Sequence, residues 1–243
     1  MQPQDVHHHI VTSYDLELTH LRGMVVAMAT TVVRQIQEAV DALIASDSAL
    51  AREVVKRELE VDTLSLAADE EVFRVIARRQ PTAVDLRLVL AIARIVGDLE
   101  RAGDKAERIA KQTLRLTETE SGPLLPESAL TPMRRLVEID CQLLLDAVAG
   151  LTETDLDKAN AVFQAEAQLS AASAALRDAL VGPAVGLTGA HFASLLIVAH
   201  ALERAGNHAN NIAEQVVYVI TGEDVRFRNR ELLIDRLRHR SPD

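Results

Sequence analysis

Aromatic residues are scarce in this 243-residue chain, at 2% of the sequence, and tryptophan is absent. Proteins that bind nucleic acid neutralise its phosphates with cations and often stack its bases on aromatic rings. The scarcity of aromatic rings and a formal net charge of −10 therefore exclude nucleic acid as an expected ligand. The single cysteine, Cys141, excludes a disulfide framework and a thiolate metal site.

Long hydrophobic runs are also missing. We find no apolar run of the roughly 18 residues that a membrane-spanning helix needs, and no basic-then-apolar leader opens the sequence. The stretch 86–96, which we rank as the most apolar, is interrupted by Arg87 and Arg94. Together with the lone cysteine, these absences predict a cytoplasmic protein.

Hydrophobic residues nevertheless make up 48% of the chain, which is ample for a core. They recur at steps of three and four residues through most of the sequence, the spacing of amphipathic helices. We therefore expect an all-α fold with six long helices and an unstructured lead-in at His7–His9. The expected helices are 13–45, 48 to the turn at Pro81, 82 to about 116, 128–150, 155–181 and 188–220.

The chain contains an internal repeat. The segment 99–104, Leu-Glu-Arg-Ala-Gly-Asp, recurs almost unchanged at 202–207 as Leu-Glu-Arg-Ala-Gly-Asn, an offset of 103 residues. Asp47 and Asp155, which are both expected helix caps, lie 108 residues apart. These offsets predict two pseudo-symmetric three-helix bundles, over 1–120 and 127–222, followed by an arginine-rich tail over 223–243.

Four acidic side chains are spaced to meet at one level of the first bundle. Asp62 and Glu100 each lie 19 residues from the turn at Pro81, and Glu58 and Asp104 each lie 23 residues from it. If two straight helices run antiparallel from that turn, the four carboxylates face each other. Glu107 lies on the same polar stripe as Glu100 and Asp104.

Converging carboxylates repel one another unless they bind a proton or a cation. Their hard oxygen ligands suit Mg²⁺, Ca²⁺, Mn²⁺ or iron, and Zn²⁺ also accepts carboxylates. We therefore predict a divalent or trivalent metal ion at Glu58, Asp62, Glu100 and Asp104, with Glu107 as an additional candidate. The same construction in the second half gives a weakened site at Glu166, Ser170, Glu203 and Asn207, because two acids have become neutral residues.

Two alternatives to a regulatory metal site stay open from the residues alone. One is a carboxylate-bridged metalloenzyme in a helical bundle, although such sites use Glu-x-x-His and the residues three after the two motif glutamates are Gly103 and Gly206. The other is a structural bundle with solvated acids. No nucleophile, phosphate-binding glycine loop or catalytic base pair is evident, so we expect no enzyme activity.

The chain resembles the PhoU family of bacterial phosphate-signalling regulators over most of its length. Three segments carry the resemblance: 79–87 (RQPTAVDLR), 98–104 (DLERAGD) and 201–214 (ALERAGNHANNIAE). The resemblance implies two three-helix bundles with E/D-x-x-x-D motifs that hold metal ions. It also implies three partners. These are the PstB-like ATPase subunit of the phosphate ABC transporter, a PhoR-like sensor kinase and a second copy of the chain.

On this resemblance the protein is expected to be a negative regulator of the phosphate-starvation response. It would be an adaptor that couples the transporter to the kinase, modulates phosphate uptake and reaches the membrane only through its partners. The motif residues Asp85, Arg87, Arg101 and Arg204 are candidates for partner binding. The chain departs from the family pattern at Lys105 and Arg108, and at Ser170 and Asn207 of the second site.

Overall fold

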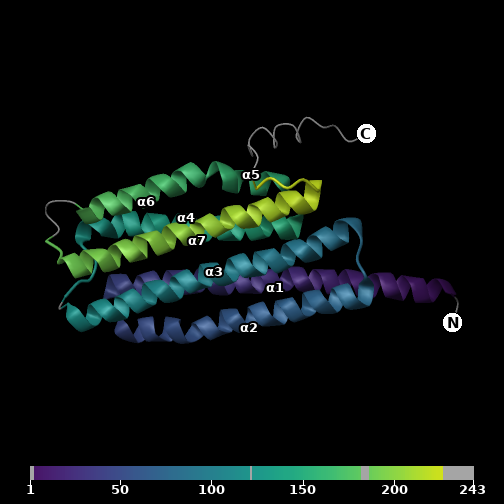
Figure 1. Cartoon of the computed structure of the whole chain (residues 1–243), viewed down its shortest axis with the longest axis horizontal. Coiled ribbons are helices and arrows are strands. Elements are labelled where there is room, and N and C mark those ends of the chain that lie inside the picture. Colours follow the sequence, from purple (N-terminus) through teal and green to yellow (C-terminus); the bar gives the residue numbers. More distant parts are fainter. Residues whose placement is uncertain (1–2, 121, 182–185, 227–243) are drawn as a thin grey trace.

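A computed structural model describes residues 3–120, 122–181 and 186–226, and within these ranges the chain is helical with no strand (Figure 1). The predicted tail beyond residue 226 and the predicted turn at 182–185 lie outside the described residues. The bounds of the helices follow in chain order. They are α1 (Pro3–Ala45), α2 (Ser48–Arg79), α3 (Ala83–Thr119), α4 (Glu127–Glu153), α5 (Leu156–Gln164), α6 (Glu166–Val181) and α7 (Gly189–Thr221).

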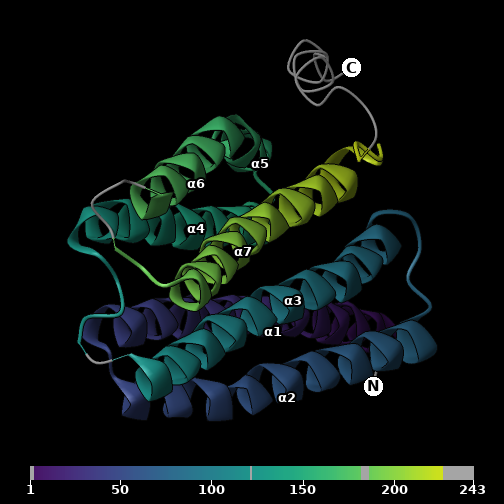
Figure 2. The same cartoon turned by 60° about the vertical axis from the view of Figure 1, so that its left-hand side comes forward.

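The helices form two bundles that lie side by side. Helices α1, α2 and α3 pack on one another, and α4 and α7 pack with the consecutive helices α5 and α6. The bundles join where α3 packs on α7 and α1 packs on α4, as the turned view shows (Figure 2). One continuous set of buried aliphatic side chains runs through both bundles. The predicted all-α fold with two three-helix units is confirmed.

Helix ends follow local chemistry. The Asp47 carboxylate accepts hydrogen bonds from the Ala49 and Leu50 amides, and Asp155 accepts them from the Asp157 and Lys158 amides, so both predicted caps satisfy amides that the helix leaves unpaired. Thr82 precedes α3 without a side-chain cap.

Three expectations need correction. Helix α1 begins at Pro3, so His7–His9 lie within a helix and are not an unstructured lead-in. The predicted fifth helix is interrupted at Ala165, which separates α5 from α6. The segment Ser13–Ala45 is long and apolar enough to cross a membrane by length and composition, contrary to our ranking of apolar stretches. In the structure this segment packs against α2, α3 and α4, as the core helix of a bundle does.

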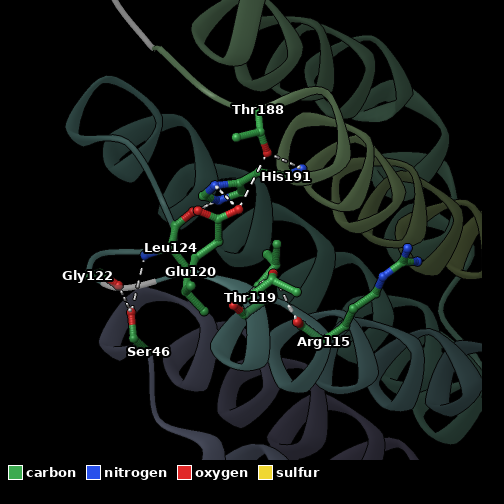
Figure 3. Close-up of polar contacts among 9 residues, drawn as sticks. Ser46, Arg115, Thr119, Glu120, Gly122, Leu124, Thr188 and His191 are labelled. Atoms are coloured by element: carbon green, nitrogen blue, oxygen red, sulfur yellow. Dashed lines mark hydrogen bonds and ion pairs between the residues drawn. The ribbon is translucent and has the colours of Figure 1, made fainter.

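Polar contacts secure the linker between the bundles (Figure 3). Ser46, at the end of α1, donates to the Gly122 carbonyl and accepts from the Leu124 amide at 3.2 Å. From the second bundle, the buried His191 side chain donates through Nε2 to the Leu124 carbonyl at 2.6 Å. Its Nδ1 atom lies 3.8 Å from a Glu120 oxygen. The linker is therefore held from both sides, which fixes how the bundles meet.

Candidate metal centre

The first acid cluster, defined here as Glu58, Asp62, Glu100, Asp104 and Glu107, lies between α2 and α3. Pro81 and the turn around it reverse the chain, so the two helices run antiparallel and their acids reach the same level. Gly103 lets the helices approach closely, because a Cβ atom there would lie 3.2 Å from a Val61 methyl carbon. The side chains of all five acids are half-buried.

The acids of this cluster perturb one another. Burial raises the pKa of Glu58 to about 8, together with a hydrogen bond shared with Asp104 and the negative charges of Glu107, Asp104 and Asp62. Burial and the charge of Asp104 likewise raise the pKa of Glu100 above its usual value. At neutral pH Glu58 therefore retains a proton in the metal-free protein, and a cation could take that proton's place.

Within the described ranges, no three acidic, histidine or cysteine side chains are already arranged to hold an ion. Binding at the first acid cluster would require carboxylates to turn toward a shared centre. The donor chemistry fits a hard cation. Among the residues that the structure describes, the five acids form one ion pair with a base, between Glu107 and Lys111. The cluster therefore has excess negative charge for a bound metal to neutralise.

The corresponding place in the second bundle is occupied differently. Glu203 accepts hydrogen bonds from the Ser173 hydroxyl at 3.0 Å and from the Arg177 guanidinium at 2.7 Å. Arg177 also donates to the Ser173 hydroxyl. The predicted partners Glu166 and Ser170 have exposed side chains on α6. The charge that a metal ion would neutralise at Glu203 is thus met by a side chain of the protein itself.

Sequence reasoning missed Arg177, although the repeat contained the signal. The offset of 108 that pairs Glu58 with Glu166 pairs Asp69 with Arg177, so an acid in the first half corresponds to a base in the second. The same offset pairs Val32 of α1 with Asp140 of α4. The two bundles therefore differ in charge at matching positions.

Asp140 is fully buried in the second bundle, and neither of its carboxyl oxygens has a hydrogen-bond partner. Its Oδ1 atom lies 2.3 Å from where a Cβ atom on Gly206 would stand. Burial raises the pKa of Asp140 well above its usual value, and repulsion from Glu203 adds to the effect. Burial therefore favours the neutral, protonated form of Asp140 in the folded protein.

A second polar cluster joins the bundles through Asp98 of α3. His208 and Asn211 of α7 each donate to its Oδ1 atom at 3.0 Å, and Arg101 donates to the same atom at 2.7 Å. Burial would raise the pKa of Asp98, but these three hydrogen bonds outweigh it and hold the pKa below its usual value. His208 is thus a buried residue that hydrogen-bonds within the core.

The four candidate partner-binding residues occupy different environments. Arg87 lies against Gly222 and donates to the Val219 carbonyl, near the C-terminal end of α7, where a positive charge is favourable. Arg101 is half-exposed and pairs with Asp98. Asp85 is half-buried and Arg204 is exposed. Arg87 and Arg101 therefore also have structural roles, and partner binding by the four stays a prediction.

Both halves of the chain match one known protein family. A family described as the PhoU domain matches residues 25–113 and 133–216, one match in each bundle. A phosphate-specific transport system accessory protein PhoU homolog from Caulobacter vibrioides is 36% identical over 227 residues, covering 92% of this chain and 96% of that protein. The accessory protein PhoU of Escherichia coli is 30% identical over 235 residues, covering 93% and 92%.

Two solved structures of PhoU proteins are similar to this chain over most of its length. The crystal structure of PhoU from Pseudomonas aeruginosa is similar with a TM-score of 0.76 and 31% identity, covering 86% of this chain and 100% of that one. The phosphate transport system regulatory protein PhoU from Streptococcus pneumoniae is similar with a TM-score of 0.77 and 26% identity, covering 88% and 100%. With both bundles matched in sequence and in fold, the chain belongs to the PhoU family.

Proposed function

We propose that this protein is an accessory and regulatory protein of a phosphate-specific transport system. The observation that carries the proposal is the match of the family to both bundles, together with relatives of nearly the same length that bear that description. The chain covers 96% and 92% of these two relatives, so it is suited to the same regulatory task. We assign it no catalytic step.

In finer detail, the protein acts in the cytoplasm as an adaptor. It docks on a PstB-like ATPase subunit and on a PhoR-like sensor kinase, represses the phosphate-starvation response when phosphate is plentiful, and modulates phosphate uptake. It reaches the membrane through these partners and acts as a homodimer. Long helices with large exposed faces support this, because an adaptor needs more than one docking surface.

The test is to delete the gene and to measure a phosphate-starvation reporter and phosphate uptake in phosphate-rich medium. We expect the reporter to be expressed despite ample phosphate, uptake to change, and wild-type protein supplied in trans to restore both. A reporter that stays silent in the deletion strain would overturn the regulatory proposal. Co-purification with the ATPase subunit tests one proposed partner contact, and co-purification with the kinase tests the other.

We also propose that the first acid cluster binds a divalent or trivalent metal ion, with Glu58, Asp62, Glu100 and Asp104 as ligands and Glu107 available as a fifth. The raised pKa of Glu58 and the excess of acids over bases support this. A bound cation would replace repulsion by attraction between α2 and α3, and so would stiffen the first bundle. The ion's identity, Mg, Mn, Fe or Zn, is left to measurement.

Elemental analysis of the purified protein tests this second proposal. Asp62→Asn with Asp104→Asn should remove the metal, whereas the matched control in the second bundle, Glu166→Gln with Glu203→Gln, should retain it. Metal-free wild-type protein whose melting temperature is unchanged by Mg²⁺, Mn²⁺, Zn²⁺ or iron would overturn the proposal. That result would leave the regulatory proposal intact, because the reporter measurement is independent of it.

A further inference from the structure

Helix α3 carries a row of arginines along the side that borders α7. The row consists of Arg87, Arg94, Arg101, Arg108 and Arg115, each seven residues from the next. Residues seven apart lie on nearly one side of a helix, with a drift of about 20° and a rise of about 10.5 Å between neighbours. Arg87 donates to the Val219 carbonyl of α7, and Arg94 donates to the Gln215 side chain. The row therefore follows the seam between the two bundles.

The first part of the row is matched by groups of the protein itself. A groove of about 420 Å³ between α3 and α7 is lined by Arg94 and Arg101, and the acids Asp98 and Glu214 line it as well. Arg101 forms an ion pair with Asp98 at 2.7 Å. Together with the contacts of Arg87 and Arg94, this satisfies the first three arginines within the fold.

The second part of the row has no such partners. Arg108 and Arg115 are exposed, and within the part of the chain that the structure describes their side chains form no ion pair or hydrogen bond. Figure 3 shows the Arg115 side chain extending away from Glu120 and His191. The same lack of ion pairs holds for two further cations of this seam. We define the basic surface as Lys105, Arg108, Arg115 and Arg204.

The internal repeat explains why the basic surface lacks an acid. The offset of 103 residues pairs the buried Asp98 with the buried Ala201. The donors around Asp98 are His208, Asn211 and Arg101, and their counterparts at this offset are Lys105, Arg108 and Arg204. Three cations are thus expected around an alanine, which has no side-chain acceptor. In a chain with a net charge of −10, this is a local excess of positive charge.

The surroundings of the basic surface favour a narrow ligand. The first acid cluster lies beside it, since the charge of Lys105 acts on the Glu100 carboxylate. A broad anionic surface, such as a membrane, would bring its charges against those acids as well as against the cations. A single small anion would meet exposed, hydrated cations, and each such pair contributes little. A narrow segment with several carboxylates avoids the acids and engages several cations at once, so its contacts reinforce one another.

We propose that the basic surface is a docking site for an acidic segment of a partner protein. An extended chain covers the roughly 10.5 Å between Arg108 and Arg115 in about three residues, so carboxylates at every third position match the row. The inference rests on the proposed adaptor function and deepens it, because it names a docking surface and the charge of the segment that docks there. The reporter measurement tests regulation and the binding measurement tests this surface, so a failure of one is distinguishable from a failure of the other.

Fluorescence anisotropy tests the site with a labelled peptide of about five Glu-Ser-Gly repeats, titrated with the full chain at low ionic strength. We expect binding that weakens as salt is added. Arg108→Glu with Arg115→Glu should weaken it at least about tenfold, because two attractions become repulsions. The matched control is Arg52→Glu with Arg78→Glu, which makes the same change of charge at exposed positions of α2 and should change the affinity less than about threefold. Thermal melting checks that each variant is folded.

Inorganic phosphate and vesicles containing phosphatidylserine test the other occupants. Phosphate should displace the peptide no better than chloride does at equal ionic strength. Preferential displacement by phosphate would overturn the proposal in favour of a small-anion site. Vesicle binding that Arg108→Glu with Arg115→Glu abolishes would overturn it in favour of a membrane contact. A wild-type chain that does not bind the peptide, or a control variant that loses binding equally, would also overturn it.

Discussion

At the scale of single residues, Asp140 shows how much an unpartnered acid costs a helical core. Its pKa is raised in the folded protein by burial and by Glu203, so the folded state holds the proton more tightly than the unfolded state does. Below the unfolded pKa of about 4 the carboxyl group is protonated in both states, so its ionisation does not oppose folding. As the pH rises toward the folded pKa, the unfolded state gives up its proton first, and the free energy of unfolding falls. The acid therefore penalises the fold increasingly in alkaline solution.

Asp140→Asn should remove this penalty without a large change in shape. We expect the free energy of unfolding of the variant to exceed that of wild type by about 1 kcal/mol or more at pH 8, because each unit of pKa shift is worth about 1.4 kcal/mol. The gain should be smaller at pH 5. Urea unfolding at the two pH values measures it, and a gain that is equal at both would show that Asp140 is ionised in the folded state.

The two repeated glycines give a matched pair of substitutions. A Cβ atom on Gly206 would lie 2.3 Å from Asp140 Oδ1 and 2.8 Å from a Leu169 methyl carbon, whereas one on Gly103 would meet Val61 at 3.2 Å. Gly206→Ala should therefore destabilise the protein by about 1–3 kcal/mol through overpacking. Gly103→Ala should stay within about 1 kcal/mol of wild type, because better helix propensity offsets a mild contact. Urea unfolding of both variants would contradict this if their effects were equal.

At the scale of elements, the packing of α3 on α7 depends on Asp98. Replacing this buried carboxylate leaves His208 and Asn211 without their acceptor, so Asp98→Ala should cost about 3 kcal/mol of unfolding free energy at neutral pH. The half-exposed Arg101 makes a weaker contribution, and Arg101→Ala should cost about 1 kcal/mol or less. Urea unfolding followed by circular dichroism compares the two, and similar losses would contradict a dominant role for the buried contacts.

The pH dependence of this contact has the opposite sign to that of Asp140. Because the pKa of Asp98 is lower in the folded protein, its stabilisation is present above the unfolded pKa of about 4 and is lost as the pH falls through the folded pKa. The difference between wild type and Asp98→Ala should thus shrink in acid. A difference that stays constant down to pH 3 would show that the hydrogen bonds do not depend on the charge.

Much of the element order was predictable because it is set locally. Asp47 and Asp155 begin helices by capping their first amides, and Pro81 ends α2, so boundaries followed from residue type. The break at Ala165 was not predictable in this way, because alanine favours helix and the interruption has no local residue signal. Tertiary packing decides such a position.

At the scale of the whole molecule, the duplication made the bundles predictable but hid their divergence. Spacing about Pro81 indicated that four acids reach one level, because helix rise is constant. The pairing of Glu203 with Arg177 depends on which rotamers meet, and spacing alone does not determine that. Two equivalent positions thus have different chemistry. The first bundle has acids in excess, and the second bundle supplies its own cation.

We propose that only the first bundle binds a metal ion. Isothermal titration calorimetry of metal-free protein with Mn²⁺ near neutral pH measures it most directly. We predict one class of sites in wild type, unchanged by Glu166→Gln with Glu203→Gln and abolished by Asp62→Asn with Asp104→Asn. Binding that survives the first-bundle substitutions, or that disappears with the second-bundle ones, would contradict the claim.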